Sequence, residues 1–364
     1  MTQPRFALND RKGPGLWKLG LAVLAVTSAM LIQPGCRPTR PAEIIPLPAR
    51  PLVFGLHVLI ESKKAAEELI KEIPALAGAG INLLFVEMDY NYEYTSHPEL
   101  RGTDPVSQET VKKIAALGRE YKIRLIPEFQ SLGHQSWEEK TFPLLARYPE
   151  FDETPGKFAG NKDIYCRSWC PLHPGVNPII FDLLDELIDV YEADGLHVGM
   201  DEVFLIASDY CPRCKGKDPA DLFAKSVNDL YGHIVKTRGK EMYLWGDRLI
   251  EGPAMSYGVW ESSYNGTWRA LDRIPKDIII CDWHYEPMRA YPSIKVFLEK
   301  GFRVLPTSFR DVRGAEAIFN YSLKFDTDRM LGHLCTIWRG PTAGETSMLP
   351  ALEAISKRLL KKPI

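Results

Sequence analysis

Short apolar runs alternate with amphipathic segments along almost the whole chain from residue 50 onward. Eight runs have the length of buried strands: residues 52–58, 82–88, 124–128, 196–200, 241–245, 277–283, 303–306 and 331–338. Helical spacing of apolar side chains predicts helices over residues 62–78, 107–121, 178–191, 219–237, 291–301 and 314–325. This alternation predicts a parallel α/β sheet, and eight strand–helix units favour a (β/α)₈ barrel. A doubly wound sheet is the alternative.

The chain of 364 residues has a formal net charge of −2 and no basic segment of the kind that binds a phosphate backbone. We therefore expect no nucleic-acid partner. The length allows one large barrel domain, which would occupy residues 51–364. A long stretch without clear periodicity, residues 135–173, interrupts the pattern after the third strand, and loops of this length inside a domain are usually functional.

The first 36 residues have the composition of an export signal. Lysine and arginine side chains precede an apolar run over residues 19–32, which is shorter than the ~20 residues that a spanning helix needs. The ending at Cys36 resembles a bacterial lipoprotein signal, in which the cysteine carries lipid and becomes the mature N-terminus. We expect an exported protein that meets the membrane only through this lipid, with secretion or a periplasmic location as the alternative. Residues 37–50, rich in proline and arginine, predict an extended tether.

Four of the seven cysteines cluster along the chain: Cys166, Cys170, Cys211 and Cys214. Export favours disulfides among them. The spacing Cys211-Pro-Arg-Cys214 also resembles a zinc knuckle, so a structural zinc site is the second interpretation. Both interpretations join the loops on either side of the fourth strand, and neither makes a cofactor necessary for chemistry.

Polar and aromatic side chains gather where the predicted strands end, which is where a barrel of this class carries its active site. They are Glu128 and His134 after the third strand, Asp201 and Glu202 after the fourth, Trp245 and Asp247 after the fifth, Trp283 and Tyr285 after the sixth, and Trp338 after the eighth. Any one tryptophan could simply pack the barrel rim. Together with carboxylates, however, flat aromatic faces indicate a sugar site, where acids bind hydroxyls and protonate a glycosidic oxygen.

Adjacent carboxylates at Asp201 and Glu202 repel each other, so such a pair indicates that one acid is held ionised and the other is pushed towards neutrality. Without the surrounding residues, the pair would as readily be a helix cap beside a solvated side chain. Among tryptophans at successive strand ends, the acid/base interpretation gains weight.

His197-Val-Gly-Met-Asp-Glu202 is similar to the His-x-Gly-Gly-Asp-Glu motif of family 20 glycoside hydrolases, the β-N-acetylhexosaminidases. The segment from Ile126 to His134 resembles that family's Ile-Pro-Glu-Ile-Asp-x-Pro-Gly-His motif, and the resemblance spans most of residues 50–340. It implies hydrolysis of N-acetylhexosamine residues from glycans by a substrate-assisted, retaining mechanism. Glu202 would be the general acid and base, and Asp201 would hold the 2-acetamido group.

The resemblance also implies roles for the remaining residues. Tyr285 would donate to the acetamido oxygen, and Trp245, Trp283 and Trp338 would form the walls of the sugar pocket. Glu128, His134 and Asp247 would complete the substrate-binding site, and no metal takes part.

This chain departs from the family pattern in its first strand. The family's arginine, which binds the outer hydroxyls of the sugar, is replaced by Val58, and its aspartate by Gly55. Met200 replaces a glycine and Gln130 an aspartate. His57 is the candidate to replace the arginine. Two other functions stay open: a glycosidase in which Asp247 or Glu128 is the nucleophile opposite Glu202, and a surface lipoprotein that binds glycans without cleaving them.

Overall fold

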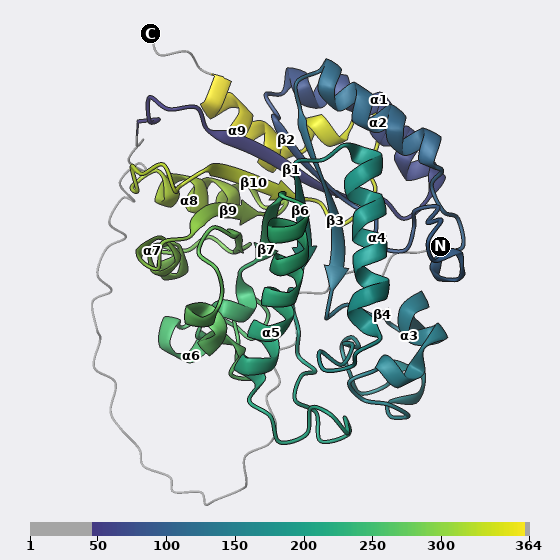
Figure 1. The fold of residues 1–364 in the computed structure, drawn as a ribbon. Coiled ribbons are helices and arrows are strands. Elements are labelled where there is room, and N and C mark those ends of the chain that lie inside the picture. The colour runs from purple at the N-terminus through teal and green to yellow at the C-terminus, as the bar shows by residue number, and fades with distance from the viewer. Residues whose placement is uncertain (1–45, 361–364) are drawn as a thin grey trace, which may run out of the picture. The chain divides into compact units, whose positions relative to one another are not determined.

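The computed structural model describes residues 46–360, which form a closed barrel of eight parallel strands surrounded by helices (Figure 1). The order around the barrel is β1-β10-β9-β8-β7-β6-β3-β2, so every strand lies between its neighbours in the chain and β1 pairs with β10. The barrel strands are β1 (Val53–Leu59), β2 (Leu83–Glu87), β3 (Arg124–Ser131), β6 (Gly195–Gly199), β7 (Glu241–Trp245), β8 (Ile279–Trp283), β9 (Arg303–Ser308) and β10 (Gly332–Thr336). The predicted (β/α)₈ barrel is confirmed, and the doubly wound alternative is wrong.

The helices follow the strands in the predicted alternation. They are α1 (Lys63–Gly78), α2 (Gln108–Glu120), α3 (Pro143–Arg147), α4 (Val176–Tyr191), α5 (Pro219–Tyr231), α6 (Gly252–Met255), α7 (Pro292–Glu299), α8 (Val312–Ser322) and α9 (Pro350–Leu360). Ser62 caps α1, as expected from its position, by accepting a hydrogen bond from the backbone N–H of Ala65. Among residues 46–360, no helix is long and apolar enough to span a bilayer.

The fifth strand is followed by no long helix, and none was predicted between residues 245 and 277. Between β7 and β8 the chain forms two 3₁₀ segments, Asp247–Leu249 and Thr267–Arg273, and the four-residue α6. The physical reason lies in the sequence, where Pro253, Gly258 and Gly266 interrupt any helical period in this connection. The connection leaves an irregular loop beside the C-terminal end of the barrel.

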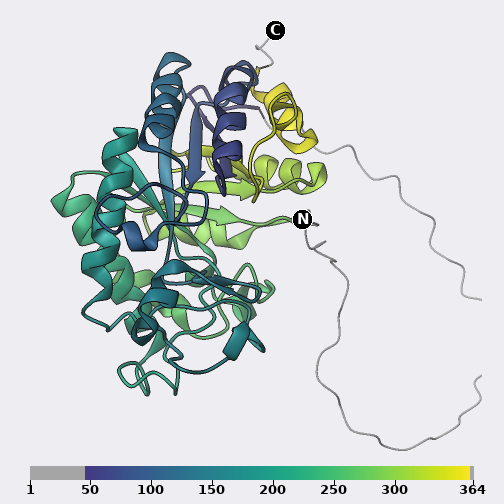
Figure 2. The ribbon, with the colours of Figure 1, turned by 90° about the vertical axis from the view of Figure 1, so that its right-hand side faces the viewer.

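The long connection from β3 to α4 is also irregular, as predicted for residues 135–173. It contains a small hairpin of β4 (Ser136–Trp137) and β5 (Lys140–Thr141), followed by α3. In Figure 1 this connection and the loop that precedes α5 gather beyond the arrowhead of β3. Figure 2 shows the same long loops together at one end of the barrel, with the regular helices beside the strands. The C-terminal end of the barrel is therefore the elaborated end.

Strand register places polar side chains in one layer inside the barrel. Glu87 of β2 pairs with Glu128 of β3, and Glu128 pairs with His197 of β6. The rest of the interior is apolar and includes Phe85, Ile126, Leu305 and Leu334. Buried acids inside an apolar barrel are costly, which makes this layer a candidate for function.

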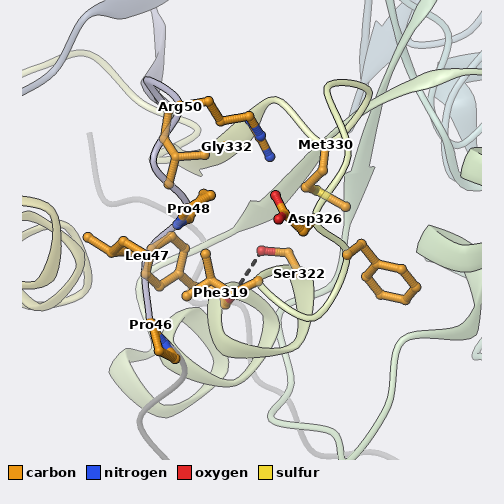
Figure 3. A pocket seen from close by; sticks show the side chains of 12 residues that line it. Pro46, Leu47, Pro48, Arg50, Phe319, Ser322, Asp326, Met330 and Gly332 are labelled. Carbon is orange, nitrogen blue, oxygen red and sulfur yellow. Dashed lines mark hydrogen bonds between the residues drawn. The ribbon is translucent and has the colours of Figure 1, made fainter.

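Residues 46–50, the described end of the predicted tether, lie at the N-terminal face of the barrel, opposite the long loops. Residues 1–45 lie outside the described residues, so the signal, Cys36 and most of the tether are not covered. Residues 46–50 have no regular structure but do pack, since Leu47 contacts the core. Figure 3 shows these residues beside Phe319 and Met330, where they line a cavity of about 210 Å³. This cavity lies where the strands begin and belongs to the packing of the tether.

Candidate active site

The Asp201–Glu202 pair follows β6 in a turn of unusual backbone conformation. Gly199, Met200 and Glu202 have φ angles of 65°, 70° and 48°, in the left-handed region that side chains with a Cβ rarely adopt. Met200 therefore occupies a conformation suited to the glycine that the family motif has there. The backbone N–H of Glu202 donates to Oδ2 of Asp247 at 2.9 Å, which fixes the turn to the neighbouring strand end.

His134 lies between the two carboxylates. Its Nε2 is 3.4 Å from Oδ2 of Asp201 and 3.4 Å from Oε2 of Glu202. Burial opposes a charge on the ring, but Asp201, and then Cys166 and Glu202, raise the pKa of His134 well above its usual value. Burial would likewise raise the pKa of Asp201, yet His134 and Gln130 lower it below the usual range. Asp201 is thus an ionised acid beside an imidazolium.

Several residues near the Asp201–Glu202 pair have strained backbone conformations. Asp89, His134, Glu202 and Trp338 all have φ between 45° and 51°, and each follows a different barrel strand. Non-glycine residues in this region cost of the order of 1–3 kcal/mol each and persist only where the surrounding structure holds them. Their placement at one end of the barrel agrees with a site built by loops on a rigid scaffold.

Asp247 is a positioning residue. Its Oδ2 accepts from the Nε of Arg248 at 2.6 Å as well as from Glu202, and its Oδ1 accepts from the indole of Trp283 at 3.3 Å. Burial, the largest influence, raises the pKa of Asp247 to about 6 although Arg248 lowers it. The carboxylate is buried and accepts from three donors, and its predicted contact with substrate stays a prediction.

Two of the predicted aromatic walls line the site together with Tyr285. The indole of Trp338 donates to the hydroxyl of Tyr285 at 2.7 Å, and the rings of Trp283 and Tyr285 pack at 4.9 Å. Because Tyr285 accepts from Trp338, its own proton is available to another acceptor. Burial raises the pKa of Tyr285, so the hydroxyl keeps that proton at neutral pH.

Glu128 and Trp245 lie below the site instead of in its wall. Both have 0% exposure, and the indole of Trp245 donates to Oε1 of Glu128 at 2.8 Å. Trp338 covers Trp245, with ring centres 5.5 Å apart. The predicted substrate contacts of Glu128 and Trp245 are therefore contradicted, because both side chains are fully buried and Trp338 covers Trp245.

The buried layer also contains His57, whose predicted role was to replace the missing arginine. Its Nε2 lies 2.8 Å from Glu87 and 3.4 Å from Glu128, and the ring is fully buried under Trp338. Burial lowers the pKa of His57 to about 4 and raises that of Glu128 to about 8. His57 is a neutral partner of buried acids, so it does not face a sugar.

The structure adds residues that sequence reasoning missed. The hydroxyl of Tyr165 hydrogen-bonds Glu202, and its ring lies 5.8 Å from that of His134 and 4.9 Å from that of Trp260. The signal for Tyr165 was its place in the long loop over residues 135–173, which was expected to be functional. The guanidinium of Arg248 donates to three backbone carbonyls and so orders the loop around Trp260. No pattern in the sequence indicated this role.

Among residues 46–360, three groups of side chains have the atoms to hold a metal ion. Two of these groups have been described above: His57 with Glu87 and Glu128 inside the barrel, and His134 with Asp201 and Glu202 at the strand ends. The third is Glu153 with Cys170, Cys211 and Cys214. Glu153 thus stands in this group where the sequence suggested Cys166, whose sulfur lies 4.0 Å from the carbonyl oxygen of Glu202. All six described cysteines are free thiols.

Comparison with known proteins gives a consistent result. Residues 67–310 match the model of glycosyl hydrolase family 20, catalytic domain. The lacto-N-biosidase of Bifidobacterium bifidum is 25% identical over 218 residues, which cover 56% of this chain and 18% of that protein. The β-hexosaminidase of Porphyromonas gingivalis is 26% identical over 167 residues, covering 46% of this chain and 21% of that protein. The matched stretches thus span about a fifth of the length of these curated relatives.

Among solved structures, the chitobiase of Flavobacterium johnsoniae has the same fold. Its TM-score is 0.62 at 19% sequence identity, and the match covers 83% of this chain and 47% of that one.

Proposed function

This chain belongs to glycosyl hydrolase family 20, and from that premise we propose that it removes N-acetylhexosamine residues from glycans by a retaining, substrate-assisted mechanism. Glu202 donates a proton to the glycosidic oxygen as the bond to the anomeric carbon breaks. The carbonyl oxygen of the substrate's own 2-acetamido group forms the new bond to that carbon. Water then opens the cyclic intermediate, and Glu202 takes up the proton that the water loses.

The observation that carries the proposal is the different environment of the two neighbouring acids. Asp201 is buried beside the His134 imidazolium, which lowers its pKa, so it can accept from the acetamido N–H and stabilise positive charge on the ring. Glu202 is somewhat more exposed, at 13% of its side chain against 6% for Asp201, and accepts from the hydroxyl of Tyr165. Tyr285 is the donor to the acetamido oxygen, because its proton is not used by Trp338.

The same geometry argues against a protein nucleophile. Asp247 uses both carboxylate oxygens to hold Glu202, Arg248 and Trp283. Glu128 has no exposed area and carries the proton that its raised pKa favours. Neither acid can approach an anomeric carbon without breaking these contacts, whereas the acetamido oxygen arrives with the substrate.

A pair of chromogenic substrates tests the proposal. We expect turnover of an aryl N-acetylglucosaminide or N-acetylgalactosaminide, and none of the matching aryl glucoside, which lacks the acetamido group. Asp201→Asn should lose most of the activity on the first substrates. Equal turnover of the glucoside, or full activity in Asp201→Asn, would rule out assistance by the substrate. Binding of chitin fragments without any cleavage would instead favour the glycan-binding function.

We also propose that the enzyme is exported and held at a membrane by lipid on Cys36. This rests on the export signal alone, since Cys36 lies outside the described residues. Radiolabelled fatty acid should label the wild-type protein and leave Cys36→Ser unlabelled. If the Cys36→Ser variant still fractionated with membranes, that result would count against the lipid anchor.

A further inference from the structure

A buried cluster of three thiols and one carboxylate lies apart from the sugar site and is not used by the proposed mechanism. Cys170 and Glu153 come from the β3–α4 connection, and Cys211 and Cys214 come from the connection between β6 and α5. All four side chains are at most 1% exposed. One ligating atom from each lies within 4.8 Å of the others, so the four could contact a single ion.

The sulfur positions do not single out a disulfide. The sulfur of Cys170 is 3.4 Å from that of Cys214 and 3.4 Å from that of Cys211, whereas a disulfide bond is about 2.05 Å long. Any one disulfide would leave the third thiol buried beside an acid. Zinc–sulfur bonds of about 2.3 Å in a tetrahedron separate sulfurs by roughly 3.8 Å, which is close to what the cluster has.

Glu153 supplies the fourth ligand. Its Oε1 accepts from the backbone N–H of Ser208 at 2.9 Å, which orients the carboxylate. Its Oε2 is fully buried and, among the described residues, receives no hydrogen bond of acceptable geometry. The carboxylate faces the thiols of Cys211 and Cys214. A buried acid in this position is costly unless a cation or a proton balances it.

Backbone amides around the thiols are arranged as they are around metal-bound thiolates. The N–H groups of Arg213 and Cys214 hydrogen-bond the sulfur of Cys211, and that of Leu172 hydrogen-bonds the sulfur of Cys170. Amide donors stabilise a thiolate over a thiol and hold it in place for a metal. The Cys211-Pro-Arg-Cys214 turn has the spacing of a zinc knuckle.

We propose that Glu153, Cys170, Cys211 and Cys214 bind one tetrahedral zinc(II) ion. Three thiolates and one carboxylate close the coordination shell, so the ion is structural and holds no water for catalysis. It joins the two loops that frame the active site, because the β3–α4 connection contains His134 and Tyr165 and the other loop begins at Asp201 and Glu202.

Metal analysis of the purified full-length chain tests the site independently of glycosidase activity. We expect about one zinc per chain by inductively coupled plasma mass spectrometry. Cys214→Ser should lose at least nine-tenths of it, and Glu153→Gln should lose zinc to a competing chelator sooner than wild type does. Cys166→Ser is the matched control, because Cys166 is a buried thiol just outside the cluster, and it should keep its zinc. Loss of zinc from Cys166→Ser but not from Glu153→Gln would overturn the ligand set.

A second measurement on wild-type protein covers the case in which the cysteine variants do not fold. After denaturation in chelator and alkylation without reductant, peptide mass spectrometry should find Cys170, Cys211 and Cys214 all alkylated. A disulfide between any two of them, or a chain with no metal or a different metal, would overturn the proposal. Because neither readout uses a sugar substrate, failure here would leave the proposed hydrolase mechanism standing.

Discussion

The two ends of this barrel surround their acids differently. At the N-terminal mouth, Glu241 is about one-third exposed and lies between two arginines, 2.7 Å from Arg124 and 2.5 Å from Arg303. Burial alone would raise the pKa of Glu241, but the arginines lower it below its usual value. Towards the C-terminal end, Glu87 and Glu128 are buried beside two histidines, His57 and His197, and burial raises the pKa of both acids.

The difference shows that burial and counter-charge together decide whether an acid keeps its proton. Arginine balances charge and cannot give up a proton, so the N-terminal mouth is suited to stability. A neutral histidine does not balance the charge of a neighbouring acid, so the acid keeps its proton or shares it with the ring. The C-terminal end of the barrel is therefore suited to proton transfer. Four predictions follow this contrast from its largest expected effect to its smallest.

Removing the acid at the active end should affect catalysis far more than removing charge at the other end. Glu202→Gln should lower kcat for a disaccharide substrate by about 10²–10⁴-fold, since general acid–base catalysis is worth that much. The loss should be smaller for an aryl leaving group, which needs little protonation. Steady-state kinetics on both substrates check this, with Arg124→Gln as the control at the N-terminal mouth. The same loss on both substrates would contradict the role of Glu202 as general acid.

Asp247 is a buried acid paired with an arginine at the active end, so its removal should cost stability. Asp247→Ala leaves the buried guanidinium of Arg248 without its carboxylate, and breaking a buried pair in this way costs about 3–5 kcal/mol. Urea unfolding of wild type and variant measures the change. Asp247→Asn keeps the hydrogen-bond acceptor and is the milder control. A change below about 1 kcal/mol in Asp247→Ala would mean that the three carbonyls around Arg248 suffice.

The protonated acids should make the fold less stable in alkali. Glu128 has a folded pKa of about 8 against an ordinary value of 4.5, so the folded state binds its proton more tightly than the unfolded state does. Its contribution is complete below pH 4.5 and is lost as the pH rises through 8. Each such proton changes the unfolding free energy by at most about 1.4 kcal/mol per pH unit.

Urea unfolding between pH 6 and pH 9 measures this slope. Glu128→Gln still accepts from Trp245 but cannot ionise, so its stability should fall less steeply than that of wild type. Stability that is flat or rises over this range in wild type would contradict the raised pKa.

The N-terminal mouth should give the smallest change. Arg124 is about one-third exposed, so water screens its contacts with Asp194 and Glu241. Arg124→Gln should therefore lower the unfolding free energy by about 1 kcal/mol, and by less in high salt. Its kcat/KM should equal that of wild type. An effect that does not shrink with salt would mean that packing, not charge, holds this end together.

The sequence was sufficient for the fold, because the fold depends on local pattern. Strands buried on both faces appear as apolar runs, and every barrel strand was predicted within three residues of its observed ends. The structure places Asp201 and Glu202 side by side after β6, but their catalytic roles rest on the family resemblance and stay predictions. The burial of Trp245 under Trp338 could not be predicted, since these residues are far apart in the chain and meet only when the barrel closes. Glu153 was missed as a thiol partner for a similar reason, because nothing in the chain near it has metal-ligand spacing.

The pairing of β1 with β10 has a consequence for the order in which the site is assembled. Asp201 and Glu202 are synthesised long before β10 and Trp338, yet the barrel cannot close until β10 is available to β1. A nascent chain therefore contains Asp201 and Glu202 before Trp338 and the closed barrel surround them. Contacts between distant parts of a chain form slowly, so such chains would be exposed to aggregation in the interval. Hydrolysis should thus begin only with the last strand, and chains ending before residue 332 should be inactive.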